Sequence, residues 1–351
     1  MDGGIKMKIL VVPDIHGSWL NAITFIEKNK DKVDKVITLG DYVDDWDEDV
    51  NGPVMIEGFN KLCSMARAEP DKFCICIGNH DNSYISETRE GSNCSGHHWE
   101  YAEQYEKMFK DNMDIINVAY LLDGILFSHA GVSQRWYIQN IGYYNNIHKF
   151  DRVPKKIMKE YLHWNDVSRD INKYYFDDMT FSLVNPETEE DKQRVKDYFK
   201  YQNDAHKKAA DLYSLMDKKY GFNKIRSYNF KVEVLNMMFH EKYSYLDHCG
   251  WNSAGDSPGE SPTWIRPDSL LHDNWPSGIR CQVVGHTELG LRFFKFGHHK
   301  LIVCDNHEHD CGFILDTEKL DELPFEKLQK PKPRKYSEKE KLLLAMLGYP
   351  C

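Results

Sequence analysis

Five short polar clusters in this sequence carry side chains that bind metal ions or transfer protons. In chain order they read Asp14-Ile15-His16, Gly40-Asp41-Tyr42-Val43-Asp44, Gly78-Asn79-His80-Asp81, Ser128-His129-Ala130-Gly131 and Gly285-His286-Thr287. Each one alone is typical of a turn or of a buried histidine with a hydrogen-bond partner. All five follow an apolar run directly, however, and chance rarely repeats such a placement. We therefore interpret them as parts of one site.

The residue types in these clusters predict the chemistry of that site. Carboxylate, amide and imidazole ligands together suit borderline divalent ions such as Mn²⁺, Fe²⁺ or Zn²⁺, whereas Ca²⁺ takes oxygen ligands alone. Six such ligands are enough for two metal ions with positions left open for water. We expect Mn²⁺ first, with Fe, Zn or Ni as alternatives.

The apolar runs before the clusters predict the elements that position them. Continuous apolar, β-branched runs bounded by glycine or proline indicate buried strands, and polar residues after them indicate loops at one edge of a sheet. That edge is where α/β folds place chemistry. Between the first two runs, residues 18–33 predict a short amphipathic helix with Leu20, Ile23 and Ile26 on its apolar face and Ser18 as a possible cap.

Composition limits the class of protein. The 351 residues are 41% hydrophobic and 28% charged, which predicts one large globular domain or two ordinary ones. A net charge of −10 disfavours general nucleic-acid binding without excluding it. Nine cysteines without a C-x-x-C pair predict reduced thiols in a reducing compartment. The apolar run near the N-terminus is too short for a signal peptide or a membrane span, so we expect a cytoplasmic protein without a membrane partner.

Changes in residue composition along the sequence predict four segments. Residues 1–149 and 248–318 carry the clusters and form the two parts of an α/β core. Residues 150–247 are rich in Lys, Asp, Tyr and Phe and predict a helical insertion or cap with solvated charged faces. Residues 319–351 read as a tail with a Pro/Lys linker and a short apolar helix.

The five clusters resemble the motifs of the calcineurin-like metallophosphoesterases, which show D-x-H, G-D-x-x-D, G-N-H-D/E, a His before Ala-Gly or Gly-Gly, and G-H-T in this order. The resemblance covers residues 8–135 and 250–316. It implies a layered α/β fold in which two mixed sheets are flanked by helices. It also implies that Asp14 and His16 hold a first metal, that Asp41 bridges, and that a second metal is held by Asn79, His129 and His286. In that family a hydroxide that bridges the metals attacks phosphorus.

The same resemblance implies catalytic roles for two further residues. His80 follows the ligand Asn79 and would protonate the leaving oxygen. Asp44 would hydrogen-bond His80, which fixes the ring and favours its charged form.

The branch of the family is indicated by two segments. Glu288 stands where nuclease-like and cyclic-nucleotide-like members carry a second metal-binding histidine. The SHAG-V-S segment and Ser261-Pro262-Thr263-Trp264-Ile265-Arg266 are similar to the phosphoprotein phosphatase branch with its bacterial and phage members, and to the related dinucleoside tetraphosphate hydrolases. This implies that Arg266 binds the substrate phosphate with two hydrogen bonds. The alternative is a surface arginine in a proline-rich loop.

One position departs from that branch. Asp45 stands where the phosphatase pattern carries an arginine that binds phosphate. Either Arg266 acts alone, or Arg135, Arg89 or Lys295 reaches the phosphate, or the substrate is not a phosphoserine-type monoester. The acidic run 44–49 also disfavours polyanions near the site.

The function predicted from these observations is a dinuclear metal-dependent phosphatase that hydrolyses phosphomonoesters, phosphoproteins included. The alternative within enzymes is a phosphodiesterase, a dinucleoside polyphosphate hydrolase or a nuclease on the same metal centre. A binding scaffold that has lost catalysis is a third class, which the complete ligand set disfavours. The expected partner is a phosphorylated substrate, either a phosphoprotein or a small phosphoester.

Overall fold

The computed structural model describes residues 6–47, 50–86, 94–140, 155–169, 188–220, 230–241, 243–247, 249, 255, 259–305 and 312–327. The chain forms two compact units, Met1–Asn145 with Tyr228–Lys330, and Asn146–Ser227 with Pro331–Cys351. The division into four segments at 149, 247 and 318 stays a prediction. The helix expected in the C-terminal tail lies outside the described residues.

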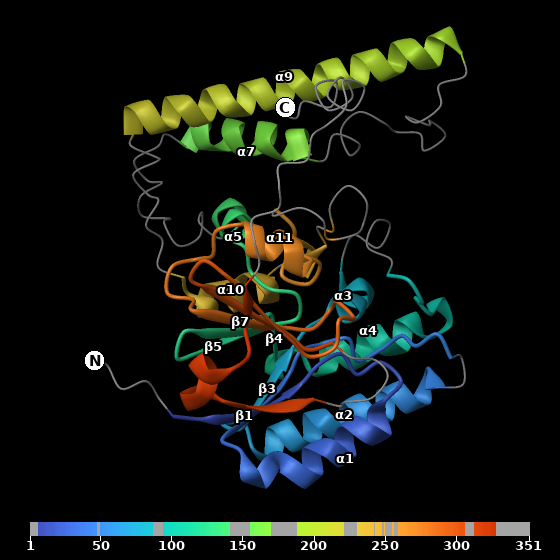
Figure 1. Cartoon of the computed structure of the whole chain (residues 1–351). Helices are drawn as coiled ribbons and strands as arrows, with labels where there is room; N and C mark the ends of the chain where they lie inside the picture. The colour runs from blue at the N-terminus through green and yellow to red at the C-terminus, as the bar shows by residue number, and fades with distance from the viewer. Residues whose placement is uncertain are drawn as a thin grey trace. The chain divides into compact units, whose positions relative to one another are not determined.

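Two mixed sheets form the body of the first unit, as predicted (Figure 1). The first sheet has the order β10-β1-β2-β3-β4 and comprises β1 (Lys8–Val12), β2 (Lys35–Thr38), β3 (Phe73–Cys76), β4 (Ile116–Asn117) and β10 (Phe313–Asp316). The second has the order β11-β8-β9-β7-β6-β5 and comprises β5 (Ala119–Leu122), β6 (Ile125–Ser128), β7 (Cys281–Val284), β8 (Arg292–Phe296), β9 (His299–Val303) and β11 (Glu326–Lys327).

A buried apolar layer joins the two sheets. Side chains alternate along a strand, so every second residue of β1 faces the same way. Ile9 and Val11 pack with Ile37 of β2 from the first sheet and with Phe127 and Val283 from the second. Cys74 and Cys76 of β3 belong to the same layer, where they serve as small core residues.

Helices cover the outer face of the first sheet. α1 (Trp19–Asn29), α2 (Pro53–Ala68) and α4 (Ala102–Asp111) pack with the alternate residues of β1, such as Leu10. α1 and α2 lie side by side in Figure 1. The helix predicted at 18–33 is present as α1, and Ile23 and Ile26 are buried as predicted. Leu20 is 82% exposed instead, and Trp19 is buried. Ser18 makes no capping hydrogen bond with its side chain.

Four more helices complete the first unit within the described residues. They are α3 (Asn79–Ile85), α5 (Gln134–Asn140), α10 (Val232–Glu241) and α11 (Pro267–His272). Asn236 attaches α10 to the start of β5, because its Oδ1 accepts from the backbone N of Val118 at 3.0 Å and of Ala119 at 3.1 Å. Its Nδ2 donates to the Ala119 carbonyl at 2.9 Å.

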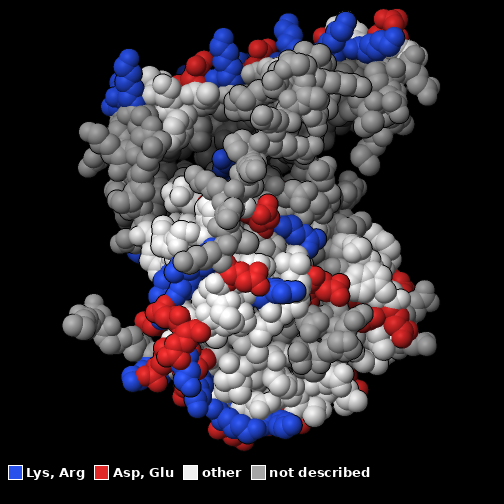
Figure 2. All heavy atoms as spheres, viewed as in Figure 1, with Lys and Arg blue, Asp and Glu red and all other residues white. Residues whose placement is uncertain are grey.

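The second unit contains two helices, α7 (Lys155–Arg169) and α9 (Glu189–Tyr220), which pack against each other. Val167, Ala205 and Met216 are buried in this unit, and the ammonium of Lys208 lies 3.8 Å from the ring centre of Trp164. Lysine and acidic side chains are spread along the side of α9 that faces away from α7 (Figure 2). Among the described helices, none has the length and apolar character needed to cross a membrane.

Candidate metal centre

The predicted ligands lie just after β1, β2, β3, β6 and β7, in loops or, for Asn79, at the first residue of α3. β1, β2 and β3 run parallel, as do β6 and β7, so in each sheet these loops emerge at one edge. The structure brings five of the predicted residues into two groups of potential metal ligands, in which the ligand atoms lie within 4.8 Å of one another. Asp41 belongs to both groups.

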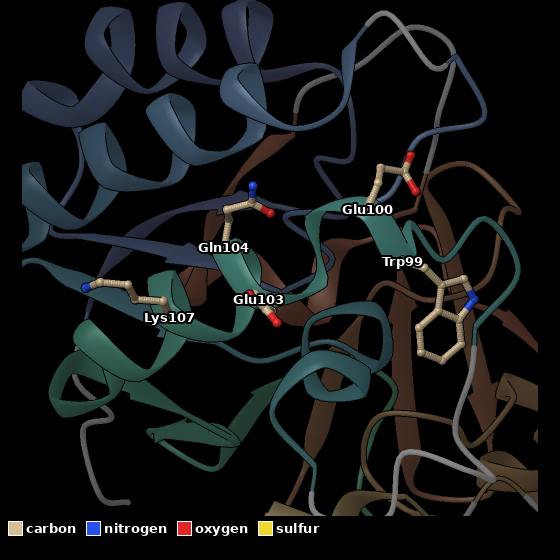
Figure 3. A pocket seen from close by; sticks show the side chains of 5 residues that line it. All are labelled: Trp99, Glu100, Glu103, Gln104 and Lys107. Carbon is tan, nitrogen blue, oxygen red and sulfur yellow. The ribbon is translucent and has the colours of Figure 1, made fainter.

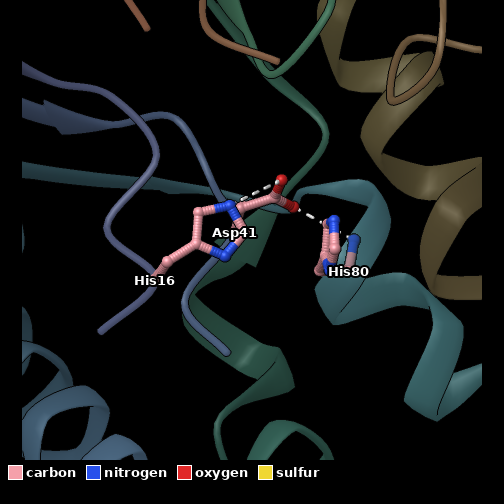
Figure 4. Close-up of side chains that lie close together, drawn as sticks. All are labelled: His16, Asp41 and His80. Atoms are coloured by element: carbon pink, nitrogen blue, oxygen red, sulfur yellow. Dashed lines mark hydrogen bonds and ion pairs between the residues drawn. The ribbon is translucent and has the colours of Figure 1, made fainter. Parts of the chain in front are cut away.

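The first group consists of His16, Asp41 and His80 (Figure 4). The Nε2 atom of His16 lies 3.6 Å from Oδ2 of Asp41. The backbone N of His80 donates to Oδ1 of the same carboxylate at 3.0 Å. All three residues are buried. The geometry therefore places His80, predicted as the acid, within reach of the same cation as His16.

The second group consists of Asp41, His129 and His286. Nε2 of His129 lies 3.4 Å from Oδ2 of Asp41 and 3.2 Å from Nδ1 of His286. It also lies 2.8 Å from Oδ1 of Asn79. The predicted ligand Asn79 is thus beside this group, and its Nδ2 donates to the Cys94 sulfur at 3.2 Å.

In each of the three histidines predicted as ligands, one ring nitrogen forms a hydrogen bond with a backbone carbonyl. Nδ1 of His129 bonds the Leu39 carbonyl at 2.9 Å, Nε2 of His286 bonds the Trp264 carbonyl at 3.0 Å, and Nδ1 of His16 bonds the Asp44 carbonyl at 2.5 Å. A carbonyl only accepts, so each of these nitrogens carries the proton. In a neutral ring the second nitrogen then carries no proton, and its lone pair faces the other predicted ligands. We call this second nitrogen the inner nitrogen.

Burial keeps two of these rings neutral. It lowers the pKa of His129 to about 3, and together with the neighbouring His129 it lowers the pKa of His286 well below its usual value. The inner nitrogens of both rings, the Asp41 carboxylate and the Asn79 amide oxygen are then acceptors that face each other. A cation satisfies such a set, and its mixed nitrogen and oxygen donors fit a borderline divalent metal.

Asp14 lies at the edge of this arrangement and belongs to neither group of three. Its carboxylate accepts from the backbone N of His286 at 3.0 and 3.1 Å. Burial raises the pKa of Asp14 well above its ordinary value, and the charge of Asp305 raises it further. Burial, followed by the charges of Asp14 and Asp81, raises the pKa of Asp41 in the same way. A divalent cation offsets this concentration of buried negative charge.

The backbone turns sharply at four of the predicted site residues. His16, Asp41, Asp44 and His286 have φ values of 43°, 52°, 68° and 61°, in the left-handed region that is uncommon for residues other than glycine. Gly78 lies so close to Asp41 that a Cβ atom at this position would be 2.1 Å from Oδ1 of Asp41. The motif glycine therefore lets the loop after β3 reach the shared carboxylate.

Asp81 holds two of these loops together. Its Oδ2 accepts from the backbone N of Asp41 at 2.8 Å and of Gly78 at 2.9 Å, and its Oδ1 accepts from the backbone N of Tyr42 at 2.7 Å. The sequence shows Asp81 inside a motif, but its spacing gives no sign of this buried structural role.

His80 forms the predicted pair with Asp44. Nδ1 of His80 lies 2.9 Å from Oδ2 of Asp44, and both side chains are buried. Burial raises the pKa of Asp44 to about 7, against the lowering effects of the Tyr84 hydroxyl, His97 and His98. The Tyr84 hydroxyl donates to Oδ1 of Asp44, a contact that the sequence analysis missed. Its signal was available, since Tyr84 lies one helical turn after His80.

Arg266 lies beside the second group. Its Nη1 donates to the His286 carbonyl at 2.9 Å and to Oγ1 of Thr287 at 3.1 Å. The other basic candidates show no contact with the two groups among the described residues. Arg135 is exposed, and Lys295 pairs with Lys300 at the start of β9, away from the strand end that faces the site. Arg89 is not among the described residues.

Two acidic residues near the site have roles that the sequence analysis did not assign. Asp45, at the position of the expected arginine, accepts from the backbone N of Gly17 at 2.9 Å and of Asp47 at 2.8 Å, so it ties the loop after β2 to the loop after β1. Asp305 is buried directly beyond β9 and raises the pKa of Asp14. A polar residue after an apolar run is the same signal that marked the predicted ligands.

A separate groove of about 500 Å³ contains none of the candidate ligands (Figure 3). Its walls come from the short helix η3 (Trp99–Tyr101) and from α4. The side chains that line it are Trp99, Glu100, Glu103, Gln104 and Lys107.

Comparison with known proteins identifies the family. The model of the calcineurin-like phosphoesterases matches residues 7–185, just over half of the chain. The chain belongs to this family. Membership implies a phosphoester hydrolase that uses divalent metal ions, and the buried histidine and aspartate groups of this calcineurin-like phosphoesterase fit such ions. No curated protein matches the chain.

Solved structures similar to this calcineurin-like phosphoesterase include three phosphoesterases. A cold-active protein-tyrosine phosphatase of a psychrophilic Shewanella species is 16% identical, with a TM-score of 0.37 over 86% of this chain and 71% of that chain. A protein serine/threonine phosphatase from Saccharomyces cerevisiae is 21% identical, with a TM-score of 0.23 over 36% and 38%. A metallophosphoesterase from Sphaerobacter thermophilus is 20% identical, with a TM-score of 0.22 over 36% and 48%.

Proposed function

We propose that this calcineurin-like phosphoesterase is a dinuclear metal-dependent phosphatase that hydrolyses phosphomonoesters. The observation that supports this most is the sharing of Asp41 between two buried groups of potential ligands. A carboxylate shared by two cations is how two-metal hydrolases hold their ions about 3.5–4 Å apart. Asp14, His16 and Asp41 would hold one ion, and Asp41 with Asn79, His129 and His286 would hold the other.

The bound ions would supply charge neutralisation at the phosphoryl oxygens and would lower the pKa of water. Hydrolysis forms a bond from a water oxygen to phosphorus and breaks the bond from phosphorus to the leaving oxygen. The leaving oxygen keeps the electron pair and needs a proton. His80 is the group that donates it, because Asp44 holds Nδ1 of the ring and leaves Nε2 for the substrate.

Arg266 is the residue proposed to bind the phosphate. Its guanidinium is already held at the loop after β7 by the His286 carbonyl and the Thr287 hydroxyl. A guanidinium fixed in this way loses little rotamer freedom when it binds an oxyanion. Its place beside the second ligand group supports this role over that of a surface arginine.

The test compares two esters on the metal-loaded protein. With added Mn²⁺, we expect p-nitrophenyl phosphate to be hydrolysed much faster than bis(p-nitrophenyl) phosphate, and Asp41→Asn to abolish both reactions by removing the shared carboxylate. The reverse ratio would make the protein a phosphodiesterase. Absence of turnover with Mn²⁺, Fe²⁺, Zn²⁺ and Ni²⁺ would favour the scaffold.

A further inference from the structure

We propose that Trp46 binds the leaving group of the substrate, and that the preferred substrates are phosphomonoesters of aromatic alcohols, in which a flat ring is bonded directly to the leaving oxygen. This inference depends on the proposed phosphatase function and names the substrate class of the same site. Trp46 lies inside the acidic run 44–49, and the sequence analysis assigned no role to its ring.

Trp46 lies at the rim of the first ligand group. Its ring centre is 5.5 Å from that of His16 and 6.4 Å from that of His80. His16 and His80 are buried, whereas 60% of the Trp46 surface is exposed. A large apolar ring is therefore open to solvent directly beside the proposed acid. Single exposed apolar side chains are common on protein surfaces, and what distinguishes Trp46 is its place beside His16 and His80.

The loop that carries Trp46 is held on both sides of the ring. The carboxylate of Asp45 accepts from the backbone N of Gly17 and of Asp47. The Asp45 carbonyl accepts from Nε2 of His98 at 3.0 Å and from Nδ2 of Asn51 at 2.8 Å. The acidic residue that replaces the expected arginine thus fixes the loop. An aromatic ring that is positioned before binding gives up little conformational entropy when a ligand arrives.

The position of the ring selects the class of leaving group. The leaving oxygen must lie within hydrogen-bond reach of His80, so a ring bonded to that oxygen comes next to Trp46. Aromatic pairs attract when their centres are about 4.5–7 Å apart. An alkyl group bonded to the same oxygen has no π face to offer. An arginine at position 45 would contact the phosphate instead, whereas this loop contributes a contact to the leaving group.

The experiment uses two esters of similar size on the full-length, Mn²⁺-loaded protein: phenyl phosphate, which is flat, and cyclohexyl phosphate, which is not. Trp46→Leu should raise the KM for phenyl phosphate about tenfold, the effect of one aromatic contact, and change the KM for cyclohexyl phosphate by less than about twofold. The kcat values should stay close to those of the parent, and Trp46→Phe should restore most of the binding of phenyl phosphate.

The matched control is Trp99→Leu, which removes a tryptophan with the same exposed fraction of 60% from the separate groove. It should leave the ratio of the two KM values unchanged. Equal KM changes for both esters in Trp46→Leu, or failure of Trp46→Phe to restore the ratio, would overturn the role of Trp46 while leaving the phosphatase function intact. If the parent hydrolyses neither ester, the proposed function itself fails.

Discussion

His80 is the residue whose role is most sharply divided between two interpretations. Its contact with Asp44 fits an acid that is oriented from behind, and its place in the group with His16 and Asp41 fits a metal ligand. The Nε2 atom of His80 can either carry a proton that it donates to the leaving oxygen or offer a lone pair to a metal ion, but not both at once. The two roles therefore make opposite predictions about metal content.

We predict that His80→Asn and Asp44→Asn each lower kcat by about 10²–10⁴-fold, as loss of a general acid does, with metal content unchanged. Steady-state kinetics and metal analysis of the purified variants check this. His272→Asn, a histidine on α11 away from both ligand groups, is the matched control and should match the parent. Loss of a metal ion from His80→Asn would show that His80 is a ligand.

Close approach between the loops after the strands is needed to bring the predicted ligands together. The loop after β2 and the loop after β3 contact each other at Gly40 and Gly78. A Cβ atom on Gly40 would lie 2.4 Å from the backbone N of Gly78, and one on Gly78 would lie 2.4 Å from the backbone N of Asp41. These neighbours are backbone atoms, which cannot rotate away.

We predict that Gly78→Ala displaces the Asp41 carboxylate and lowers metal affinity at least tenfold, with a loss of about 1–3 kcal/mol in the free energy of unfolding from the overpacked loop. Calorimetric metal titration and chemical denaturation measure the two effects. Gly290→Ala is the control, since its φ of 67° is strained but no heavy atom lies within 4 Å of the added Cβ. It should lose stability and keep the metal. Equal metal affinity in both variants would contradict the prediction.

The strands and the loops that follow them could be predicted from the sequence, because buried apolar runs and the residues after them are local patterns. The first turn of α1 could not, since Trp19 rather than Leu20 is buried by packing against distant elements such as Phe59, whereas Ile23 and Ile26 are buried as predicted. The contact of Trp46 with His16 joins residues far apart in the chain and leaves no mark in the spacing, whereas Tyr84 could have been found from its place one helical turn after His80. Asp305, in contrast, carried the strand-end signal.

For the molecule as a whole, the buried carboxyl groups connect stability to pH and to metal. Burial raises the pKa of Asp44 and that of Asp81 to about 7, and the pKa values of Asp14 and Asp41 are raised as well. A carboxyl with a raised pKa in the folded state destabilises that state once it ionises. The cost is absent below the unfolded pKa near 3.8, grows as pH rises, and is complete above the folded pKa.

We therefore predict that chelation lowers the melting temperature and that the chelated protein is less stable at pH 8 than at pH 6.5. The buried histidines oppose this trend only weakly. Their lowered pKa values keep them neutral in the folded state, so each ring adds only what the unfolded ring gives up when it loses its remaining proton above pH 6.5, about 0.4 kcal/mol. The metal-loaded protein, whose carboxylates are already ionised, should change little. Thermal melts in EDTA and in Mn²⁺ at both pH values measure the difference. A chelated protein that is equally stable at pH 8, or more so, would contradict the assignment of these carboxyl groups.

The left-handed backbone at His16, Asp41, Asp44 and His286 makes stability and activity favour different residues at these positions. At each of these positions a residue other than glycine costs the folded chain on the order of 1 kcal/mol. Selection for thermal stability alone would favour glycine or asparagine there. Under the proposed function, such variants would be more stable than the parent and would hydrolyse no substrate. Any hardy natural variant that keeps all four side chains must have gained its robustness elsewhere in the molecule.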